Sequence, residues 1–431
     1  MLRHILALSI PSIVTNITTP LLGMTDVAIA GHMGSAVYIA AIAVGGNMFN
    51  MLYWLLGFLR MGSSGMTAQA YGASDHAGAA LVLWRSLLLA MAIGLLFVML
   101  QKPICTLLLH WMDVDGLTSQ LASDYFHILI WGAPAALGGF ALTGWFLGMQ
   151  NSRVPMWVSL TMDVTNIAAS LLLVYTAGMG LRGLAVGTLI AQWGGLLMAL
   201  VICVRRYHPT FPPLHEIMRG DGILKYFKVN TDIFLRTVCL VAVTLWFTRT
   251  GASQGPVILA VNALLMQLFT FFSFFMDGFA FSGEALCGRY KGASDGVSFR
   301  MAVRMLFVVS GTLAALFTLF YLLAGNGFLH LLSDDPDVVT TSTDYFGWAV
   351  TVPLAGFVAF TADGIFIGAT ATRRMLISMA CATAVFFGVY LLAFPAMHNH
   401  GLWLAFISYL AVRGVVLLLL LPGIQPPYSA R

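Results

Sequence analysis

The chain has 431 residues, of which 59% are hydrophobic and only 9% are charged, and its mean hydropathy is +0.89. Too few polar groups remain to solvate a water-soluble globule of this length, so the composition predicts an integral membrane protein. The formal net charge of +4 is small and its sign comes from arginines beside apolar segments, which gives no indication of a nucleic-acid partner. The five cysteines are scattered without metal or redox spacing, and we expect them to serve in packing.

Apolar runs of about 20 residues, the length that crosses a bilayer as a helix, recur along the whole chain. In the first half they lie near 5–28, 37–60, 80–100, 122–147, 155–176 and 183–205. In the second half they lie near 229–250, 257–281, 301–324, 342–368, 374–395 and 401–421. We therefore expect an all-α integral membrane protein with 12 transmembrane helices.

The longest polar stretch, 206–228, contains three prolines and separates the two sets of six runs. It predicts an N-terminal six-helix bundle over 1–205, a cytoplasmic linker over 206–228, a C-terminal six-helix bundle over 229–421 and a cytoplasmic tail over 422–431.

The two halves repeat each other at a constant offset of 220 residues. Three motifs return without a gap: Asp124-Tyr125-Phe126 as Asp344-Tyr345-Phe346, Gly72-Ala73-Ser74-Asp75 as Gly292-Ala293-Ser294-Asp295, and Gly144-x-Phe146-x-Gly148 as Gly364-x-Phe366-x-Gly368. Duplication explains this better than chance identity. Because each half carries an even number of segments, both should cross the membrane in the same sense, related by a pseudo-two-fold axis along its normal, which is an architecture of transporters.

Basic residues crowd the loops on one side of the predicted membrane, among them Arg3, Arg153, Arg205, Arg206, Arg373 and Arg374. The opposite loops contain Lys102, Arg182 and Arg249. By the positive-inside rule the first set of loops is cytoplasmic, so both termini are expected in the cytoplasm of a bacterium whose inner membrane holds the protein.

Charges inside the apolar runs mark the candidate functional positions, because a charge at mid-bilayer costs roughly 2.5–3.5 kcal/mol on insertion scales. They are Asp26, Arg60, Arg85, Asp163, Arg236, Asp277, Glu284, Asp363 and Arg413.

Asp26 stands out among them because its helix is otherwise uncharged after His4 and contains Pro11 and Pro20. Each proline removes a backbone donor and favours a kink. A carboxyl on a helix predisposed to bend suits a protonation switch. The alternative interpretation is an aspartate near the outer helix end that is solvated or caps the following loop.

Around these residues the sequence resembles the DinF branch of the multidrug and toxic compound extrusion (MATE) transporters. Three segments carry the resemblance: Pro11-x8-Pro20-Leu21-Leu22-Gly23-Met24-Thr25-Asp26-x4-Gly31-His32, the run from Phe58 to Ala70, and the run from Met276 to Ala285. It spans all the predicted helices and the duplication. It implies two six-helix bundles that face each other in a V and alternate between outward- and inward-open states. It also implies export of amphiphilic, often cationic compounds in exchange for protons or sodium, and we expect a monomer in the lipid bilayer.

Within this resemblance, Asp26 matches the aspartate that takes up the coupling ion, and Pro11 matches the proline at which the first helix bends. Asn166 and Thr188 match polar residues that face this aspartate. The family often has a second aspartate where this chain has Ser170, which cannot hold a proton at physiological pH. Asp163, one turn earlier, either substitutes for it or is an interfacial charge. We expect coupling to rest on one carboxylate.

The second half offers a different coupling site. Sodium-coupled relatives of the NorM branch use acidic groups in the seventh and tenth helices, where this chain has Arg236 and Asp363. An arginine is a poor neighbour for a bound cation. We therefore interpret Arg236 with Asp277, Glu284 or Asp363 as a buried structural charge network, with a cation site as the alternative.

These patterns predict a proton-coupled multidrug antiporter without enzymatic activity, cofactor or metal. A sodium-coupled exporter and a lipid-linked oligosaccharide flippase of the same superfamily are the nearest alternatives, the flippase requiring a strongly cationic cleft. A major facilitator transporter would carry a charged signature between helices two and three, where this chain reads Tyr71-Gly72-Ala73-Ser74. An intramembrane enzyme would need paired catalytic carboxylates, a histidine-rich metal motif or a Ser/His pair, and the sequence has none at membrane depth.

Overall fold

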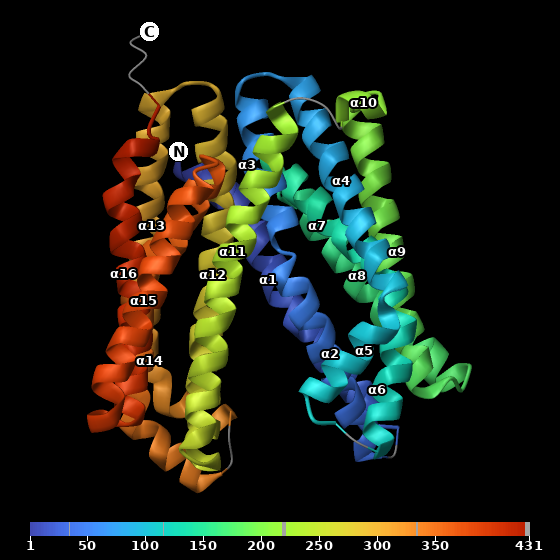
Figure 1. The fold of residues 1–431 in the computed structure, drawn as a ribbon, viewed down its shortest axis with the longest axis vertical. Coiled ribbons are helices and arrows are strands. Elements are labelled where there is room, and N and C mark those ends of the chain that lie inside the picture. Colours follow the sequence, from blue (N-terminus) through green and yellow to red (C-terminus); the bar gives the residue numbers. More distant parts are fainter. Residues whose placement is uncertain (34, 115, 218–220, 333–334, 427–431) are drawn as a thin grey trace. The chain divides into compact units, whose positions relative to one another are not determined.

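The computed structural model describes residues 1–33, 35–114, 116–217, 221–332 and 335–426, and these form helices joined by short loops (Figure 1). Twelve segments of this described part are long and apolar enough to cross a membrane. The prediction of an all-α protein with 12 transmembrane helices is confirmed. Residues 218–220 of the predicted linker and 427–431 of the predicted tail lie outside the described residues.

The first half contains more separate helices than the sequence predicted. They are α1 (Leu2–Gly31), α2 (Ala36–Leu55), α3 (Phe58–Gly72), α4 (His76–Met99), α5 (Gln101–Trp111), α6 (Gly116–Leu129), the short 3-10 helix η1 (Ile130–Gly132), α7 (Ala133–Gly148), α8 (Arg153–Leu171), the π-helical turn η2 (Leu172–Thr176), α9 (Gly180–Tyr207) and the short α10 (Leu214–Ile217).

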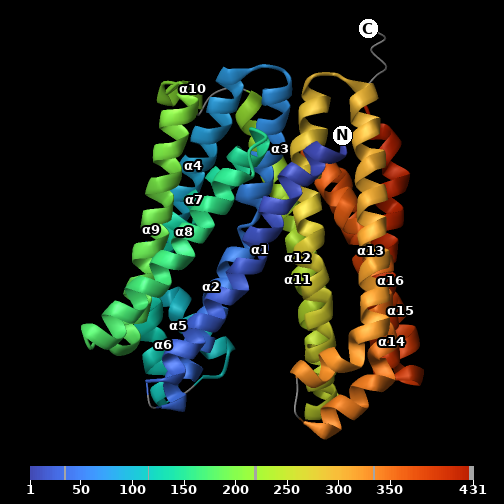
Figure 2. The same ribbon diagram turned by 180° about the vertical axis from the view of Figure 1, so that it is seen from behind.

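The second half has longer, continuous helices (Figure 2). They are α11 (Asp221–Ser253), α12 (Pro256–Gly292), α13 (Gly296–Leu332), α14 (Pro336–Gly368), α15 (Thr372–Met397), α16 (Asn399–Leu420) and the terminal η3 (Leu421–Ile424). At the 220-residue offset, α12 covers α2 and α3, α13 covers α4 and α5, and α14 covers α6 to α7.

One of the extra breaks has a clear cause in the sequence. Pro103 lies in the first turn of α5, where its missing N–H costs no helical hydrogen bond, and its ring disfavours a helix that continues through from α4. The equivalent position in α13 is Leu323, which lets that helix run on.

Both repeated motifs build the same local structure twice. Ser74 and Ser294 adopt left-handed backbone conformations, with φ of 57° and 54°. The next residue then caps the following helix: Asp75 accepts from the Gly78 N–H at 2.8 Å and Asp295 from the Ser298 N–H at 2.9 Å. The repeated Gly-Ala-Ser-Asp motif is therefore a helix–turn–helix connection.

The repeated Gly-x-Phe-x-Gly frame marks a close helix crossing. A Cβ on Gly144 would collide with the backbone carbonyl of Arg60 on α3, and one on Gly364 would collide with that of Ala280 on α12. The two collisions lie 220 residues apart on both partners, so the duplication preserves the crossing itself.

The chain divides into two compact units, and the division falls inside helices. The N-terminal unit comprises Ile10–Tyr226, and the C-terminal unit comprises Met1–Ser9 together with the chain from Phe227 onward. In the C-terminal unit, the Ser282 hydroxyl bonds Ser9 Oγ at 2.6 Å and donates to the Ile5 carbonyl at 3.0 Å.

The described part of the linker packs on α4 within the N-terminal unit. Trp84 donates its indole N–H to the Thr210 carbonyl at 3.0 Å, and Arg85 Nε donates to the Ile217 carbonyl at 2.8 Å. The Tyr226 hydroxyl donates to Ser86 Oγ at 3.1 Å. Three consecutive residues of α4 therefore hold this segment, and Arg85 serves it structurally.

Candidate functional site

Asp26 lies on the buried face of α1 in the N-terminal unit. Its residue is 9% exposed, and Ile29 and Ala30, three and four positions later, belong to the apolar core of this unit. The neighbouring Val27 is exposed. Asp26 Oδ1 is buried and has no hydrogen-bond partner among the described residues. The carboxyl is thus desolvated and not paired at this oxygen, which differs from a solvated or capping aspartate.

Asn166, Ser170 and Thr188 form a chain of hydrogen bonds between α8 and α9. The Ser170 hydroxyl donates to Asn166 Oδ1 at 3.0 Å, and Asn166 Nδ2 donates to Thr188 Oγ1 at 3.1 Å. The Thr188 hydroxyl donates to the Leu184 carbonyl at 3.1 Å. Gly187 makes the close approach feasible, because a Cβ there would meet the Ser170 hydroxyl and backbone.

Tyr125 joins this chain to Asp26, and sequence reasoning missed it. The residue lies on α6, is 4% exposed, forms a side-chain hydrogen bond with Thr188 and interacts electrostatically with Asp26. The signal was available, since Tyr125 lies in the repeated Asp-Tyr-Phe motif, but that motif served only to establish the duplication. Asp124 beside it makes an exposed ion pair with Arg182 at 2.8 Å.

Pro11 and Pro20 both lie inside the single helix α1. The Thr15 hydroxyl donates to the Pro11 carbonyl at 3.0 Å. The boundary between the two units, Ser9 to Ile10, directly precedes Pro11. The bending role of either proline stays a prediction.

Asp163 faces α1 at another level. It is half-buried on α8 and forms a side-chain hydrogen bond with Thr18, while its Oδ2 is buried without a hydrogen-bond partner among the described residues. Its hydrogen-bonding partner is thus on α1 and not in the chain formed by Asn166, Ser170 and Thr188.

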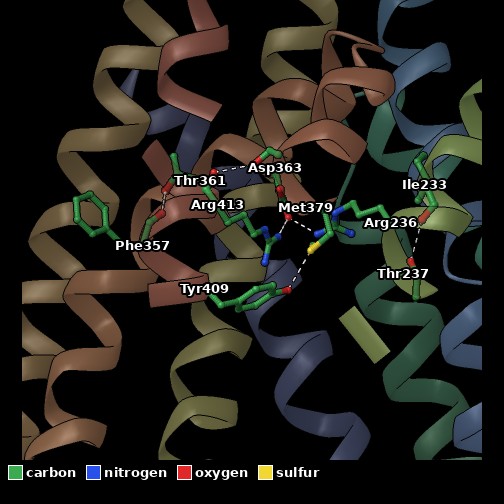
Figure 3. A network of polar contacts seen from close by, with 10 residues as sticks. Ile233, Arg236, Thr237, Phe357, Thr361, Asp363, Met379, Tyr409 and Arg413 are labelled. Carbon is green, nitrogen blue, oxygen red and sulfur yellow. Dashed lines mark hydrogen bonds and ion pairs between the residues drawn. The ribbon is translucent and has the colours of Figure 1, made fainter. Parts of the chain in front are cut away.

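In the C-terminal unit, two arginines converge on one aspartate (Figure 3). Arg236 of α11 and Arg413 of α16 both donate from Nη2 to Asp363 Oδ2 of α14. All three residues are buried, at 6%, 4% and 7% exposed. The Tyr409 hydroxyl lies close by and donates to Met379 Sδ at 3.0 Å.

Asp277 and Glu284 of α12 interact with Arg236 through their charges, and Asp277 also interacts with Arg413. Glu284 is 1% exposed. The structure therefore brings together all four charges that the sequence grouped and adds Arg413, which the sequence flagged as a charge in an apolar run without placing it. Its position in the group is set by the packing of α14 against α16.

A further buried acid, Asp232 of α11, was overlooked. It is 5% exposed, accepts from the Thr372 hydroxyl at 3.0 Å and lies 3.7 Å from Arg373. Asp232 lies inside the run 229–250, so the criterion that selected the other intramembrane charges applied to it equally. Over the described ranges, no group of three or more His, Cys, Asp or Glu side chains has the arrangement of a metal site.

The comparisons with known proteins agree with this architecture. The MatE family model matches both halves separately, over residues 11–172 and 232–391. The DNA damage-inducible protein F of Escherichia coli strain K12 is 38% identical over 413 residues, which cover 95% of this chain and 90% of that protein. The probable multidrug resistance protein NorM of Idiomarina loihiensis is 22% identical, covering 98% of this chain and 94% of that protein.

Solved structures share the fold. A MOP superfamily transporter from Pyrococcus furiosus has a TM-score of 0.86 at 19% identity, covering 98% of this chain and 95% of that one. A crystal structure of MATE in the bent conformation has the same TM-score, identity and coverage. With the twelve apolar helices, these matches define a multi-pass inner-membrane transporter and not an enzyme. The chain belongs to the MATE family of multidrug and toxic compound extrusion transporters.

Proposed function

We propose that this transporter exports small amphiphilic, often cationic compounds in exchange for protons, by alternating access, as a monomer in the bilayer with both termini in the cytoplasm. The substrate class is supported by relatives named multidrug resistance proteins. The orientation is supported by the concentration of basic residues in one set of loops.

The observation that carries the proposal is the environment of Asp26. Its carboxyl is buried, has an oxygen without a hydrogen-bond partner, and lies on the helix that contains Pro11 and Pro20. A buried carboxylate without full compensation is unfavourable, and taking up a proton removes the charge. Proton binding at this position therefore changes the electrostatic energy of α1, which is the property that a coupling site requires.

The C-terminal unit supports proton coupling in a different way. Asp363 is bound by the guanidinium groups of Arg236 and Arg413, so an external cation would have to displace a buried arginine to reach its Oδ2. This also bears on the oligosaccharide flippase, because the positive charge of these two arginines is compensated by Asp363 and its acidic neighbours.

Sodium coupling remains the second candidate on one observation. The side chains of Asp26, Asn166, Ser170 and Thr188 supply oxygen atoms, and Tyr125 adds another, which is the ligand type that hard cations prefer. No other feature of the described residues distinguishes sodium from a proton at this position.

The deciding experiment uses proteoliposomes in which proton and sodium gradients are imposed separately. We expect an inwardly directed proton gradient to drive export of a fluorescent monovalent cation with no sodium present. Asp124→Asn, which removes an exposed carboxyl, should transport like the wild type. Export that follows the sodium gradient and ignores the pH gradient would refute proton coupling.

A further inference from the structure

A second polar contact joins α8 to α1, two helical turns before Asp26 and between the two prolines. Asp163 forms a hydrogen bond with Thr18. The Thr18 hydroxyl lies 3.0 Å from the Thr15 carbonyl, to which it donates, and the Thr15 hydroxyl donates to the Pro11 carbonyl. A line of hydrogen bonds thus runs from a carboxyl on α8 along α1 to Pro11.

The number of protons decides what this line can do. A threonine hydroxyl has one proton, so Thr18 can donate either to the Thr15 carbonyl or to Asp163, but not fully to both. When it donates to Thr15, its bond to Asp163 requires a protonated carboxyl as donor. When Asp163 is ionised, the carboxylate can only accept, and Thr18 must turn its proton away from Thr15.

We propose that Asp163 is a second protonation site of this transporter, which controls the hydrogen bonding of α1 between Pro11 and Pro20 through Thr18. A protonated Asp163 leaves the Thr18 to Thr15 bond in place, and an ionised Asp163 withdraws it. This inference rests on the proposed proton coupling for its role in transport, although the titration of Asp163 can be measured independently. Asp163 is a positioning residue, since it acts on the helix that carries Asp26.

Few other groups compete for this carboxyl. α9, η2 and α7 pack against α8. The titratable residues on these elements, on α8 and on the N-terminal unit's part of α1 are Asp26, Arg153, Tyr175, Arg182, Cys203, Arg205, Arg206 and Tyr207. Arg182 pairs with Asp124, and Tyr175 donates to the Ile29 carbonyl at 3.3 Å. The local influences on Asp163 are its burial and Thr18.

Infrared difference spectroscopy of the purified transporter in detergent, between low and high pH, tests the titration directly. Asp163→Asn should remove one band of a protonated carboxyl, and Asp26→Asn should remove a different one. Thr18→Val should shift the frequency of the Asp163 band without removing it, because the bonding partner is lost, and Thr18→Ser should restore the original frequency. Asp124→Asn, an exposed carboxyl, serves as the control and should leave both bands in place.

The outcomes separate this inference from the proposed function. A spectrum of Asp163→Asn that keeps every carboxyl band, or a Thr18→Val spectrum without a shift, overturns the second site even if Asp26 proves to be the coupling group. Conversely, an Asp163 band that responds to Thr18 supports the second site even if transport follows sodium.

Transport measurements complete the test. The amide of Asp163→Asn donates to Thr18 at every pH, so this variant should flatten the pH profile of export while substrate affinity stays unchanged. We expect export to fall about tenfold at the pH where the ionised form acts in the wild type, since a hydrogen bond to a charged group corresponds to a factor of that order. A pH profile identical to that of the wild type would contradict the proposal.

Discussion

The two halves of this chain share one backbone plan and fill it with opposite chemistry. Counted back by 220 residues, the aromatic Trp246, Phe386 and Tyr390 of the second half correspond to Asp26, Asn166 and Ser170 of the first. Trp246 and Tyr390 are in edge contact, with ring centroids 5.8 Å apart, and Phe386 stacks on Tyr390. Where the N-terminal unit has a polar pocket, the C-terminal unit has packed rings.

The reverse holds for the charge network. Arg236, Asp363 and Arg413 correspond to Asn16, Thr143 and Trp193 in the first half. The repeated glycine crossings and helix caps are kept in both halves, whereas the polar groups are not. Duplication has therefore preserved the scaffold, and each half has acquired a separate buried site. We infer that coupling belongs to the first half and that the second half's network is structural.

The largest expected effect comes from removing the carboxyl of the first half. Asp26→Asn should abolish export while the protein stays folded in the membrane, because the amide cannot exchange a proton and no ion pair is lost. Drug resistance of cells that express the variant, together with its amount in the membrane, measures both parts. Full resistance in cells that carry Asp26→Asn would show that coupling lies elsewhere.

Breaking the network of the second half should affect stability first. Asp363→Asn leaves the buried guanidiniums of Arg236 and Arg413 without their shared partner, and loss of one member of a buried pair typically costs about 3–5 kcal/mol. We expect a clearly lower melting temperature in detergent, and proton-driven export by the fraction that remains folded. A folded variant of normal stability that no longer transports would move the coupling site to the second half.

The equivalence of the two scaffolds can be tested at the repeated crossing. Gly144→Ala and Gly364→Ala each place a Cβ against a backbone carbonyl, and overpacking of this kind costs about 1–3 kcal/mol or more. Both variants should lose stability by similar amounts in thermal unfolding. Gly139→Ala, which has open space around its Cβ, is the matched control. A large difference between the first two would mean that the halves do not use the frame alike.

The smallest effect concerns the hydrogen-bond chain beside Asp26. Ser170→Ala removes one donor to Asn166 Oδ1 and should lower stability by about 1 kcal/mol. Ser378→Ala in the second half removes a comparable buried bond, to the Arg413 carbonyl. We expect similar melting temperatures for the two variants but reduced export only for Ser170→Ala. Equal export by both would remove Ser170 from the site.

The fold could be predicted from the sequence because its signals are local. Hydropathy located every membrane helix, and the 220-residue offset related the two halves without alignment gaps. The break between α4 and α5 was missed because the apolar pattern runs through it, although Pro103 marks the position. The assignment of Met1–Ser9 to the C-terminal unit depends on contacts between Ser9 and Ser282, which are 273 residues apart and leave no local trace.

The site was predictable only in part. Asp26 and Asp363 were found because a charge in an apolar run is conspicuous. Tyr125 was missed because a tyrosine in a membrane helix is ordinary, and only the fold shows that it meets Thr188. The contact of Asp163 with Thr18 depends on how α8 packs on α1, so the sequence left open whether Asp163 lies near the coupling site.

Counting protons on substrate binding tests the central claim most directly. In weakly buffered detergent solution, a substrate that binds the wild type should release protons, because binding and protonation exclude each other in an antiporter. We expect this release to disappear in Asp26→Asn and to persist in the folded fraction of Asp363→Asn. Release that survives in Asp26→Asn, or that is lost only in Asp363→Asn, would contradict the assignment of coupling to the first half.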